Sequence, residues 1–517
     1  MASLLVIGLV LPSCTGEEKL EPVLYVFENG KINIGIAGEL NYTAGAMQWT
    51  GATLAQEAIN DGGIDIGGVS YILELVPIET GEETVDPTGL TGVLNLTAEI
   101  DGVDFILGGF RAEAVEVYRY VAMDKGVIFI NCGAAAETLQ HSVVDDYADY
   151  RFWFKGTPCN EYFLGQSLVR ILGAVATKLR EEMGVASDYA LNATIVADNS
   201  EWAWKQVVDI KDLLGSINVN LVQDPYWVNA AGSEAEMESA LTSIRALDPQ
   251  FIIPVFSADA GALYDVLRAS YVPNAMNAMS VGINVLAQLK SPWGALDNEE
   301  SPPPCAYEVI LDAWAEGLEQ TEKTAAFLDA FMTVTSGEYP LNTVATYDAL
   351  FGLKAAIEAV AWYDAEDGVA YAWADDIIQW MEDPANAQVT TTGLTTYYPR
   401  PGTTAAGKPA LTEAQVRSLY DLDSYNYTYT YDTKDWTMPA HTTHDLAYGP
   451  GLLTGVGVQW QWDDEAGQWK KVGVWPIDFG DDYDEALTDQ YGCWNFEYSG
   501  TVDLVIPQNV IDHHTPE

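Results

Sequence analysis

The residues best placed to bind a ligand lie between positions 102 and 139. Two short apolar strands are expected there, Phe105 to Leu107 and Val127 to Ile130, and each runs into small residues. A helix is expected between them, from about Ala114 to Met123. A strand that ends in glycine and feeds a helix leaves backbone N–H groups free at the helix start, and in open α/β sheets ligands bind at these carboxyl ends. The crossover therefore predicts a small-molecule site.

Arg111 stands in the first of these two loops, directly before the helix. Its planar guanidinium matches a carboxylate and can hold it with two parallel hydrogen bonds. An internal ion pair with Glu113 or another acid of the chain is the alternative.

The histidines give no support to enzyme chemistry. They are His141, His441, His444, His513 and His514, and none lies in a Gly-x-Ser-x-Gly or HExxH context. His441 and His444 are too few and too isolated for a metal site, and a turn-stabilising role fits them better. We therefore expect no catalytic residue, no metal and no cofactor.

Strands and helices alternate along most of the chain. After the strand Lys31 to Gly38, the first half reads strand, helix, strand, helix, strand, helix, strand, up to the loop Phe152 to Asn160. The pattern then repeats, with strands expected at 193–197, 219–222, 251–255 and 278–282. This alternation predicts parallel sheets covered by helices on both faces. We expect an α/β protein with two doubly wound parallel-sheet lobes.

The C-terminal part differs in character. Residues 391–445 carry Thr, Tyr, Pro and Gly with little periodicity, which indicates a long surface insertion. Segments 452–462 and 468–475 alternate around Asp463 to Gly467 and predict a C-terminal β-hairpin. Its tryptophans favour packing within the hairpin over a sugar-binding platform.

Length and charge restrict the possible partners. At 517 residues the chain is too long for a single compact core. It has 76 acidic against 23 basic residues, a formal charge of −53. Such a surface repels nucleic acid and anionic lipid headgroups, so neither is expected as a partner through bulk charge. Solubility in a saline or extracellular medium is the favoured interpretation of the acidity, and a polycationic ligand is the alternative.

The N-terminus predicts export. Residues 1–14 form a short apolar run that ends in Leu11-Pro-Ser-Cys14, similar to a signal peptide with a lipobox, in which Cys14 would be lipidated. A buried N-terminal strand is the alternative, and residues 15–30 are expected to form a tether. No later stretch is long and apolar enough to span a membrane. In an exported chain, Cys132, Cys159, Cys305 and Cys493 could form two disulfides, with three pairings open.

Several segments, in order, resemble one family. They are Ile34-Gly-Ile-Ala-Gly38, Asn60-Asp-Gly-Gly63, Phe105-Ile-Leu-Gly-Gly-Phe110, Gly126 to Gly133, Tyr347-Asp-Ala349, His444-Asp-Leu-Ala-Tyr-Gly-Pro450, Gly457-Val-Gln-Trp460 and Val474-Trp-Pro476. Together they resemble the type I periplasmic-binding proteins, specifically the solute-binding subunits of branched-chain amino-acid-type ABC importers. The resemblance spans about residues 31–476.

The resemblance implies two lobes joined by a three-crossover hinge that closes on a ligand. The first lobe would comprise 31–155 and 287–365, and the second 156–286 and 366–476 with the insertion 391–445. Residues 477–517 would form a C-terminal extension.

It also implies a binding site. In leucine-type members, groups after two neighbouring strands hold the ligand's α-carboxylate, an aromatic residue of the second lobe covers the ligand, and a further group pairs its ammonium. Those places fall here on Arg111, Ala112, Glu113, Gly133, Ala134, Ala135, Trp202, Ser257 and Asn284. The usual hydroxyls are missing and Asn284 stands where a carboxylate is expected, so the ligand could be another small polar molecule.

The implied function is capture of a small polar solute, an amino acid or related compound, and its delivery to an ABC permease. The protein would lie on the extracellular face of the membrane through a lipid anchor. The alternatives are a ligand-sensing ectodomain that acts through a membrane partner, and a hydrolase.

Overall fold

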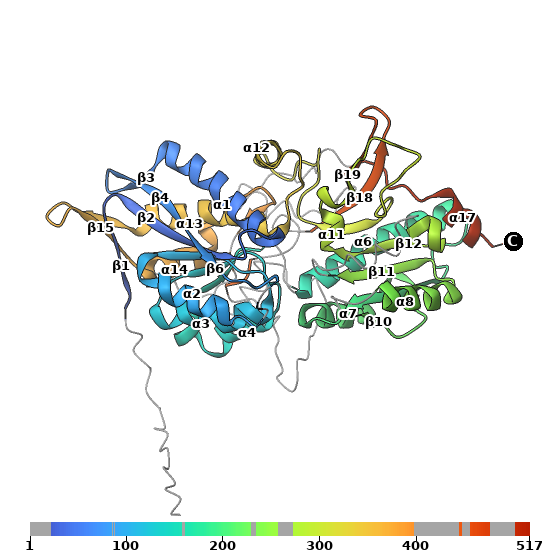
Figure 1. Cartoon of the computed structure of the whole chain (residues 1–517), viewed down its shortest axis with the longest axis horizontal. Coiled ribbons are helices and arrows are strands. Elements are labelled where there is room, and N and C mark those ends of the chain that lie inside the picture. Colours follow the sequence, from blue (N-terminus) through green and yellow to red (C-terminus); the bar gives the residue numbers. More distant parts are fainter. Residues whose placement is uncertain are drawn as a thin grey trace, which may run out of the picture.

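Two α/β lobes lie side by side along the long axis of the molecule (Figure 1). The structure, a computed structural model, describes residues 22–84, 86, 88–157, 161–228, 234–256, 272–395, 397, 444–446, 455–475 and 502–516. Each lobe is built on a sheet whose strands are mainly parallel, as the alternating sequence pattern predicts. Residues 1–21, with Cys14, and Ser257 are outside the described residues.

The sheet of the first lobe has the order β3-β4-β2-β5-β6-β7. Its strands are β2 (Lys31–Gly38), β3 (Ile64–Ile66), β4 (Val69–Glu79), β5 (Phe105–Gly108), β6 (Phe129–Asn131) and β7 (Trp153–Lys155). All neighbours are parallel except β3 and β4. The residues of β5, β6 and β7 are all buried, as expected of parallel strands with helices on both faces.

Helices cover both sides of this sheet. They are α1 (Thr43–Gly62), α2 (Leu90–Glu99), α3 (Ala112–Lys125), α4 (Thr138–Asp145), α5 (Tyr147–Tyr150) and α13 (Thr346–Val360). α1 packs against α13, and α2 packs against α3. α3 ends because Gly126 adopts a left-handed conformation and donates its N–H back to the last turn.

A small antiparallel sheet is attached to the first lobe. It joins β1 (Leu24–Phe27), β15 (Val369–Trp373) and β14 (Trp362–Asp364), and α14 (Ala374–Glu382) follows. Phe27, Ala370 and Ile377 are buried in the core of the first lobe. The tether expected at 15–30 therefore contains a strand, and the first lobe continues beyond residue 365, where we had expected the second lobe.

The sheet of the second lobe has the order β10-β8-β11-β12-β13-β18-β19, and β9 pairs with β8. Its strands are β8 (Leu191–Asp198), β9 (Val219–Leu221), β10 (Tyr226–Val228), β11 (Phe251–Phe256), β12 (Met279–Asn284), β13 (Val309–Asp312), β18 (Val456–Asp463) and β19 (Gln468–Trp475). The helices of this half are α6 (Glu161–Met183), α7 (Glu201–Leu214), α8 (Glu234–Leu247), α10 (Val272–Met276), α11 (Val285–Gln288) and α17 (Gln508–His514). α12 (Thr324–Val334) packs against α1 of the first lobe.

β13 corrects the expected lobe boundary. It pairs in parallel with β12 and antiparallel with β18, so residues 309–312 belong to the second sheet and not to the first lobe. The hairpin of β18 and β19 is confirmed. Trp460 and Trp469 are buried, but they pack in a cluster that the hairpin shares with residues 287–339 and not within the hairpin alone.

Remaining expectations concern cysteines, the insertion and the membrane. Cys132 and Cys305 are free and buried, so two disulfides among the four cysteines do not form. The structure describes only parts of the insertion expected at 391–445. These parts are residues 391–395, which include β17 (Leu394–Thr395), Tyr397 and residues 444–445. Among the described residues, no helix is both long and apolar enough to cross a membrane.

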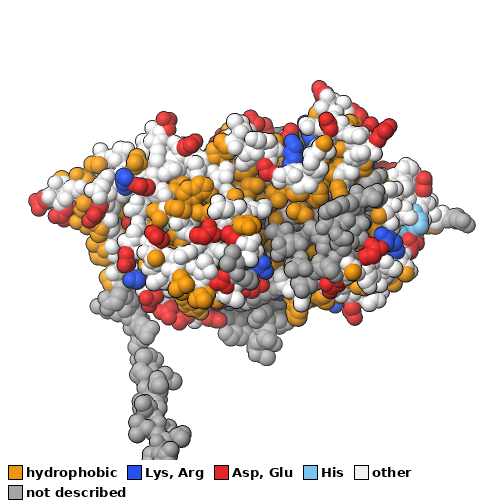
Figure 2. Space-filling view, viewed as in Figure 1, with side chains coloured by type: hydrophobic (Ala, Val, Ile, Leu, Met, Phe, Trp, Pro, Cys, Tyr) orange, Lys and Arg blue, Asp and Glu red, His pale blue; other side chains and the backbone are white. Residues whose placement is uncertain are grey.

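Acidic side chains are spread over both lobes on the face in Figure 2, where basic side chains are few.

Candidate functional site

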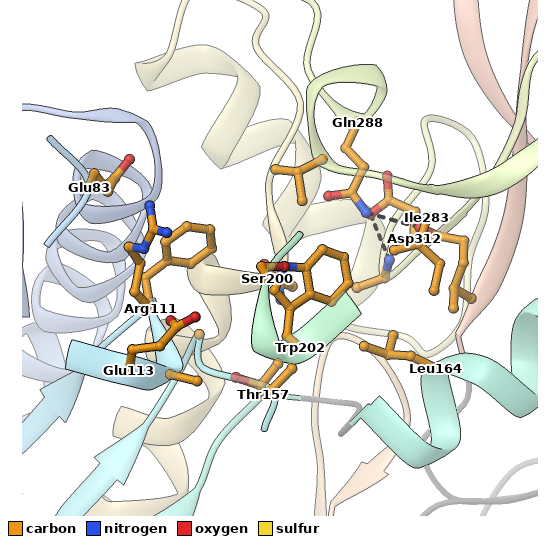
Figure 3. A pocket seen from close by; sticks show the side chains of 18 residues that line it. Glu83, Arg111, Glu113, Thr157, Leu164, Ser200, Trp202, Ile283, Gln288 and Asp312 are labelled. Atoms are coloured by element: carbon orange, nitrogen blue, oxygen red, sulfur yellow. Dashed lines mark hydrogen bonds between the residues drawn. The ribbon is translucent and has the colours of Figure 1, made fainter. Parts of the chain in front are cut away.

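A cleft of about 1090 Å³, measured out to the solvent at its mouth, opens between the lobes. Its first wall comes from the loops that follow β4, β5 and β6. Its second wall comes from α7, α11 and the ends of β12 and β13. Most of its lining is apolar, and Phe110 and Leu311 are among the larger side chains. Figure 3 labels three others, Leu164, Trp202 and Ile283. This is the crevice at the carboxyl ends of parallel strands where ligands bind in open α/β sheets.

The loop after β5 places Arg111 and Glu113 at the cleft. Gly108 has a φ of +123°, and a Cβ there would lie 2.1 Å from the carbonyl oxygen of Ala37. Only glycine fits this turn, which brings Phe110 and Arg111 to the start of α3. Glu113 reaches into the cleft from the first turn of α3, between Arg111 and Trp202 in the view of Figure 3.

A carboxylate of the protein itself occupies the start of α3. The N–H groups of Phe110 and Arg111 donate to Oε2 of Glu82, at 3.2 and 3.0 Å. Thr80 donates its hydroxyl to the other oxygen of Glu82 at 2.9 Å. Burial raises the pKa of the Glu82 carboxyl to about 7, although these hydrogen bonds favour its charged form. Glu82 therefore already occupies the two N–H groups that directly precede α3.

Glu83, the residue after Glu82, accepts N–H groups at the start of a second helix, α1. Glu83 accepts hydrogen bonds from the N–H groups of Ala44 and Gly45, at 3.2 and 2.9 Å, in the first turn of α1. Its own N–H donates to the buried Glu39 at 2.7 Å, which fixes the loop. Consecutive glutamates thus hold the starts of two helices on the first wall, where the helix dipole favours negative charge.

The loop after β6 is also satisfied internally. Oδ1 of Asn131 accepts the N–H groups of Gly133 and Ala134, at 3.3 and 3.0 Å. Nδ2 of Asn131 donates to the carbonyl of Ala134 at 2.6 Å. A Cβ at Gly133 would lie 2.2 Å from the carbonyl oxygen of Gly109, so the two loops touch here through backbone alone. Gly133 and Ala135 line the cleft, whereas Ala134 is buried beside them.

The second wall is built from α7 and two strand ends. Ser200 and Trp202 lie at the start of α7 (Figure 3), and Trp202 also packs against the core of the second lobe. Ile283 and Leu311 come from β12 and β13. The indole face is therefore held by packing on one side and lies at the cleft on the other.

A buried ion pair lies behind this wall. Nζ of Lys471 lies 2.5 Å from Oδ2 of Asp312, and both side chains are fully buried. Lys471 also donates to the carbonyl of Gln288 at 2.8 Å, and Asp312 accepts the N–H of Ala313 at 2.7 Å. Burial raises the pKa of Asp312, and the Lys471 ammonium opposes this shift. Asp312 and Gln288 line the cleft, so the pair fixes part of its wall.

Polar contacts connect the lobes at the back of the cleft. The N–H of Glu137 donates to Oε1 of Glu161 at 2.8 Å, and the N–H of Glu161 donates to the carbonyl of Ala135 at 3.1 Å. Nζ of Lys205 on α7 lies 3.9 Å from Glu137. Burial raises the pKa of Glu137 to about 7 and that of Glu161 well above its ordinary value, with the charge of Glu137 adding to the second shift.

The structure brings together six of the site residues expected from the sequence. The residues at the cleft are Arg111, Ala112, Glu113, Gly133, Ala135 and Trp202. Asn284 is fully buried and donates to Glu308 at 3.4 Å, away from the lining. Lining residues that the sequence did not indicate are Glu83, Phe110, Thr157, Leu164, Ser200, Ile283, Val285, Gln288, Leu311, Asp312, Ala313 and Asn342.

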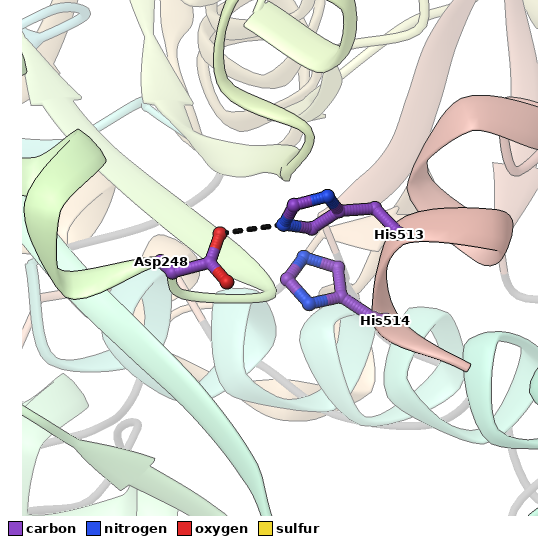
Figure 4. Close-up of side chains that lie close together, drawn as sticks. All are labelled: Asp248, His513 and His514. Atoms are coloured by element: carbon purple, nitrogen blue, oxygen red, sulfur yellow. Dashed lines mark hydrogen bonds and ion pairs between the residues drawn. The ribbon is translucent and has the colours of Figure 1, made fainter. Parts of the chain in front are cut away.

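Three potential metal ligands, Asp248, His513 and His514, gather at the far end of the second lobe (Figure 4). Nε2 of His513 lies 2.7 Å from Asp248. Both ring nitrogens of His514 are in use, with Gln250 at 3.0 Å and the carbonyl of Asn277 at 2.7 Å. The arrangement fits attachment of α17 better than metal binding, because a metal would have to displace one of these bonds. His444 is likewise buried, bonded to the carbonyl of Trp153 and to Glu382.

Comparisons with known proteins support the fold. The sequence matches no protein-family model and no curated protein. A Silicibacter pomeroyi protein assigned to a branched-chain amino acid ABC transporter has a TM-score of 0.59 at 16% identity, over 93% of this chain and 100% of that chain. An ABC transporter solute-binding protein of R. palustris in complex with benzoate has a TM-score of 0.55 at 13% identity, over 86% and 96%. The substrate-binding protein of a Streptococcus pneumoniae branched-chain amino acid transporter, in complex with isoleucine, has a TM-score of 0.52 at 19% identity, over 71% and 92%.

Proposed function

Because the chain has the type I periplasmic-binding-protein fold, we propose that it is an extracellular solute-binding protein that delivers a small solute to an ABC permease. The observation that carries this proposal is the open cleft, lined from both lobes at the carboxyl ends of their parallel strands. The solute would be a small molecule with a polar group and an apolar body, an amino acid or a related compound. Closure of the lobes would enclose it.

The lining supports this type of solute. Apolar side chains dominate the cleft, with a few polar groups among them, as in most binding sites for small organic molecules. The solved relatives in complex with benzoate and isoleucine hold ligands with the same combination of a charged group and an apolar body. Attachment of the protein to the membrane through a lipid on Cys14 belongs to the same proposal.

The test is a binding screen on the purified protein. Thermal unfolding is measured against amino acids, amides, aromatic acids and amines, because a ligand of the native state raises the midpoint; at 100 times Kd the gain is about 2.7 kcal/mol. W202A should abolish the shift. W204A is the matched control, because Trp204 is on the same helix but is 57% exposed and outside the cleft lining.

Closure and transport provide the second part of the test. A bound ligand should reduce the radius of gyration in small-angle X-ray scattering as the lobes close. A strain without the protein should lose uptake of the same labelled compound. A folded protein that binds no member of the screen, or binds one equally well in W202A, would contradict the proposal.

A further inference from the structure

The backbone groups that would anchor a ligand carboxylate are largely occupied. Phe110 and Arg111 donate their N–H groups to Glu82, and Gly133 and Ala134 donate theirs to Asn131. These are the two strand ends to which the family resemblance assigns the α-carboxylate. A ligand anion would have to displace groups of the protein there.

The first turn of α3 does not replace these anchors. The N–H groups of Ala112 and Glu113 remain at the helix start, but the Glu113 side chain is on the same turn. Its carboxylate repels a second anion, and so does the nearby Glu82 when it is ionised. The wall is therefore unfavourable for a carboxylate ligand.

The charged side chains at the cleft lead to the same conclusion. Glu83 binds the start of α1, Asp312 is paired with Lys471, and Arg111 already interacts with another group of the chain. In the described part of the chain, Glu113 makes no side-chain hydrogen bond or ion pair. Once Asp312 is offset by Lys471, the charged groups lining the cleft carry a net negative charge.

The opposite wall suits a cation with an apolar body. Trp202 lies at the cleft across from Glu113 in Figure 3, and tryptophan is the side chain whose ring face attracts ammonium groups best. Leu164, Ile283 and Leu311 provide apolar surface beside it. A carboxylate on one side and an indole on the other can hold an ammonium group and the hydrocarbon attached to it.

We propose that the solute is a small organic amine that lacks a carboxylate, with its ammonium group on the Glu113 carboxylate and its apolar body against Trp202. This inference rests on the proposed function and specifies its ligand class. An amino acid or an aromatic acid would meet occupied anchors on the first wall, whereas an amine requires none of them.

The test uses compounds that share an apolar body and differ in charge. Isothermal titration at pH 7.5 compares 2-phenylethylamine, 3-phenylpropionate and phenylalanine, and then isoamylamine, isovalerate and leucine. We expect an amine of at least one series to bind at micromolar concentration, and its acid and amino acid not to bind. E113Q should weaken the amine about tenfold or more, because a charge-assisted hydrogen bond is lost.

D124N is the charge-matched control, since Asp124 is exposed on the same helix. It should leave the affinity unchanged, which separates a contact in the cleft from the effect of net charge. Binding of an acid or an amino acid that depends on Trp202 but not on Glu113 would overturn the ligand class and leave the proposed function intact. Failure of both amines at millimolar concentration would also overturn it, and the wider screen then decides the proposed function separately.

Discussion

Removal of the buried Lys471 ammonium should destabilise the second lobe strongly. The Nζ to Oδ2 distance to Asp312 is 2.5 Å, and neither side chain is exposed. At an effective dielectric constant of about 20, two unit charges at that distance attract by about 7 kcal/mol, from which the cost of removing both from water must be subtracted. The penalty for leaving one buried charge without its partner is about 3–5 kcal/mol, and we expect K471M to lose stability in that range.

The assay is urea unfolding followed by tryptophan fluorescence at pH 8 and pH 5. K471M leaves an Asp312 carboxyl whose pKa in the folded state is above its value in the unfolded chain. Such a group stabilises the fold at low pH and loses that contribution as the pH rises through its pKa in the folded state. The loss of stability in K471M should therefore be smaller at pH 5 than at pH 8. The double variant D312N/K471M should regain most of the loss, because neither charge then remains.

K470M is the matched control. Lys470 is the preceding residue, is partly exposed, and lies 3.1 Å from Asp463 and 3.4 Å from Glu316. Its removal should cost no more than about 1 kcal/mol. A K471M loss no larger than that of K470M, or a double variant no more stable than K471M, would refute the reasoning about the buried pair.

Two further predictions concern buried carboxyls and a strained turn. Burial raises the pKa of Glu82 and Glu137 to about 7, so both favour the fold at acidic pH, and raising the pH from 5 to 8 should cost about 2–3 kcal/mol for each. The thermal midpoint should be higher at pH 5, and E82Q and E137Q should each flatten the dependence; a higher midpoint at pH 8 would contradict this. G108A should lose about 3 kcal/mol or more in urea unfolding, because the new Cβ would overlap the carbonyl of Ala37. G317A is its control, since Gly317 has a φ of +79° with open space around it, and equal losses in the two variants would exclude the clash as the cause.

The repeating strands and helices of both lobes could be predicted because their signals are local. β2, β5, β8 and β11 are short apolar runs followed by glycine or by polar loops, and the structure has strands there. β13 was missed because it has four residues and follows a proline-rich segment, and its strand depends on pairing with β12 and with β18, about 150 residues later. The sheet of β1 and β15 was missed for the same reason.

The candidate site was predictable only in part. Arg111, Glu113 and Gly133 follow recognisable strand ends, so their place at the cleft could be expected. Glu82 and Glu83 could not be singled out among 76 acidic residues. Their role depends on a loop that folds back onto the starts of two helices, and no local pattern encodes that contact.

The pairing of β13 with β18 has a consequence for synthesis on the ribosome. The main sheet of the first lobe has all its strands once Lys155 has been made, so its pairing can begin early. The second sheet has to wait until β18 and β19 emerge, and until then β13 is a short, apolar strand with one unpaired side. Unpaired strand edges promote association between incomplete chains. We therefore expect the period between synthesis of residues 312 and 475 to be when the nascent chain depends most on chaperones.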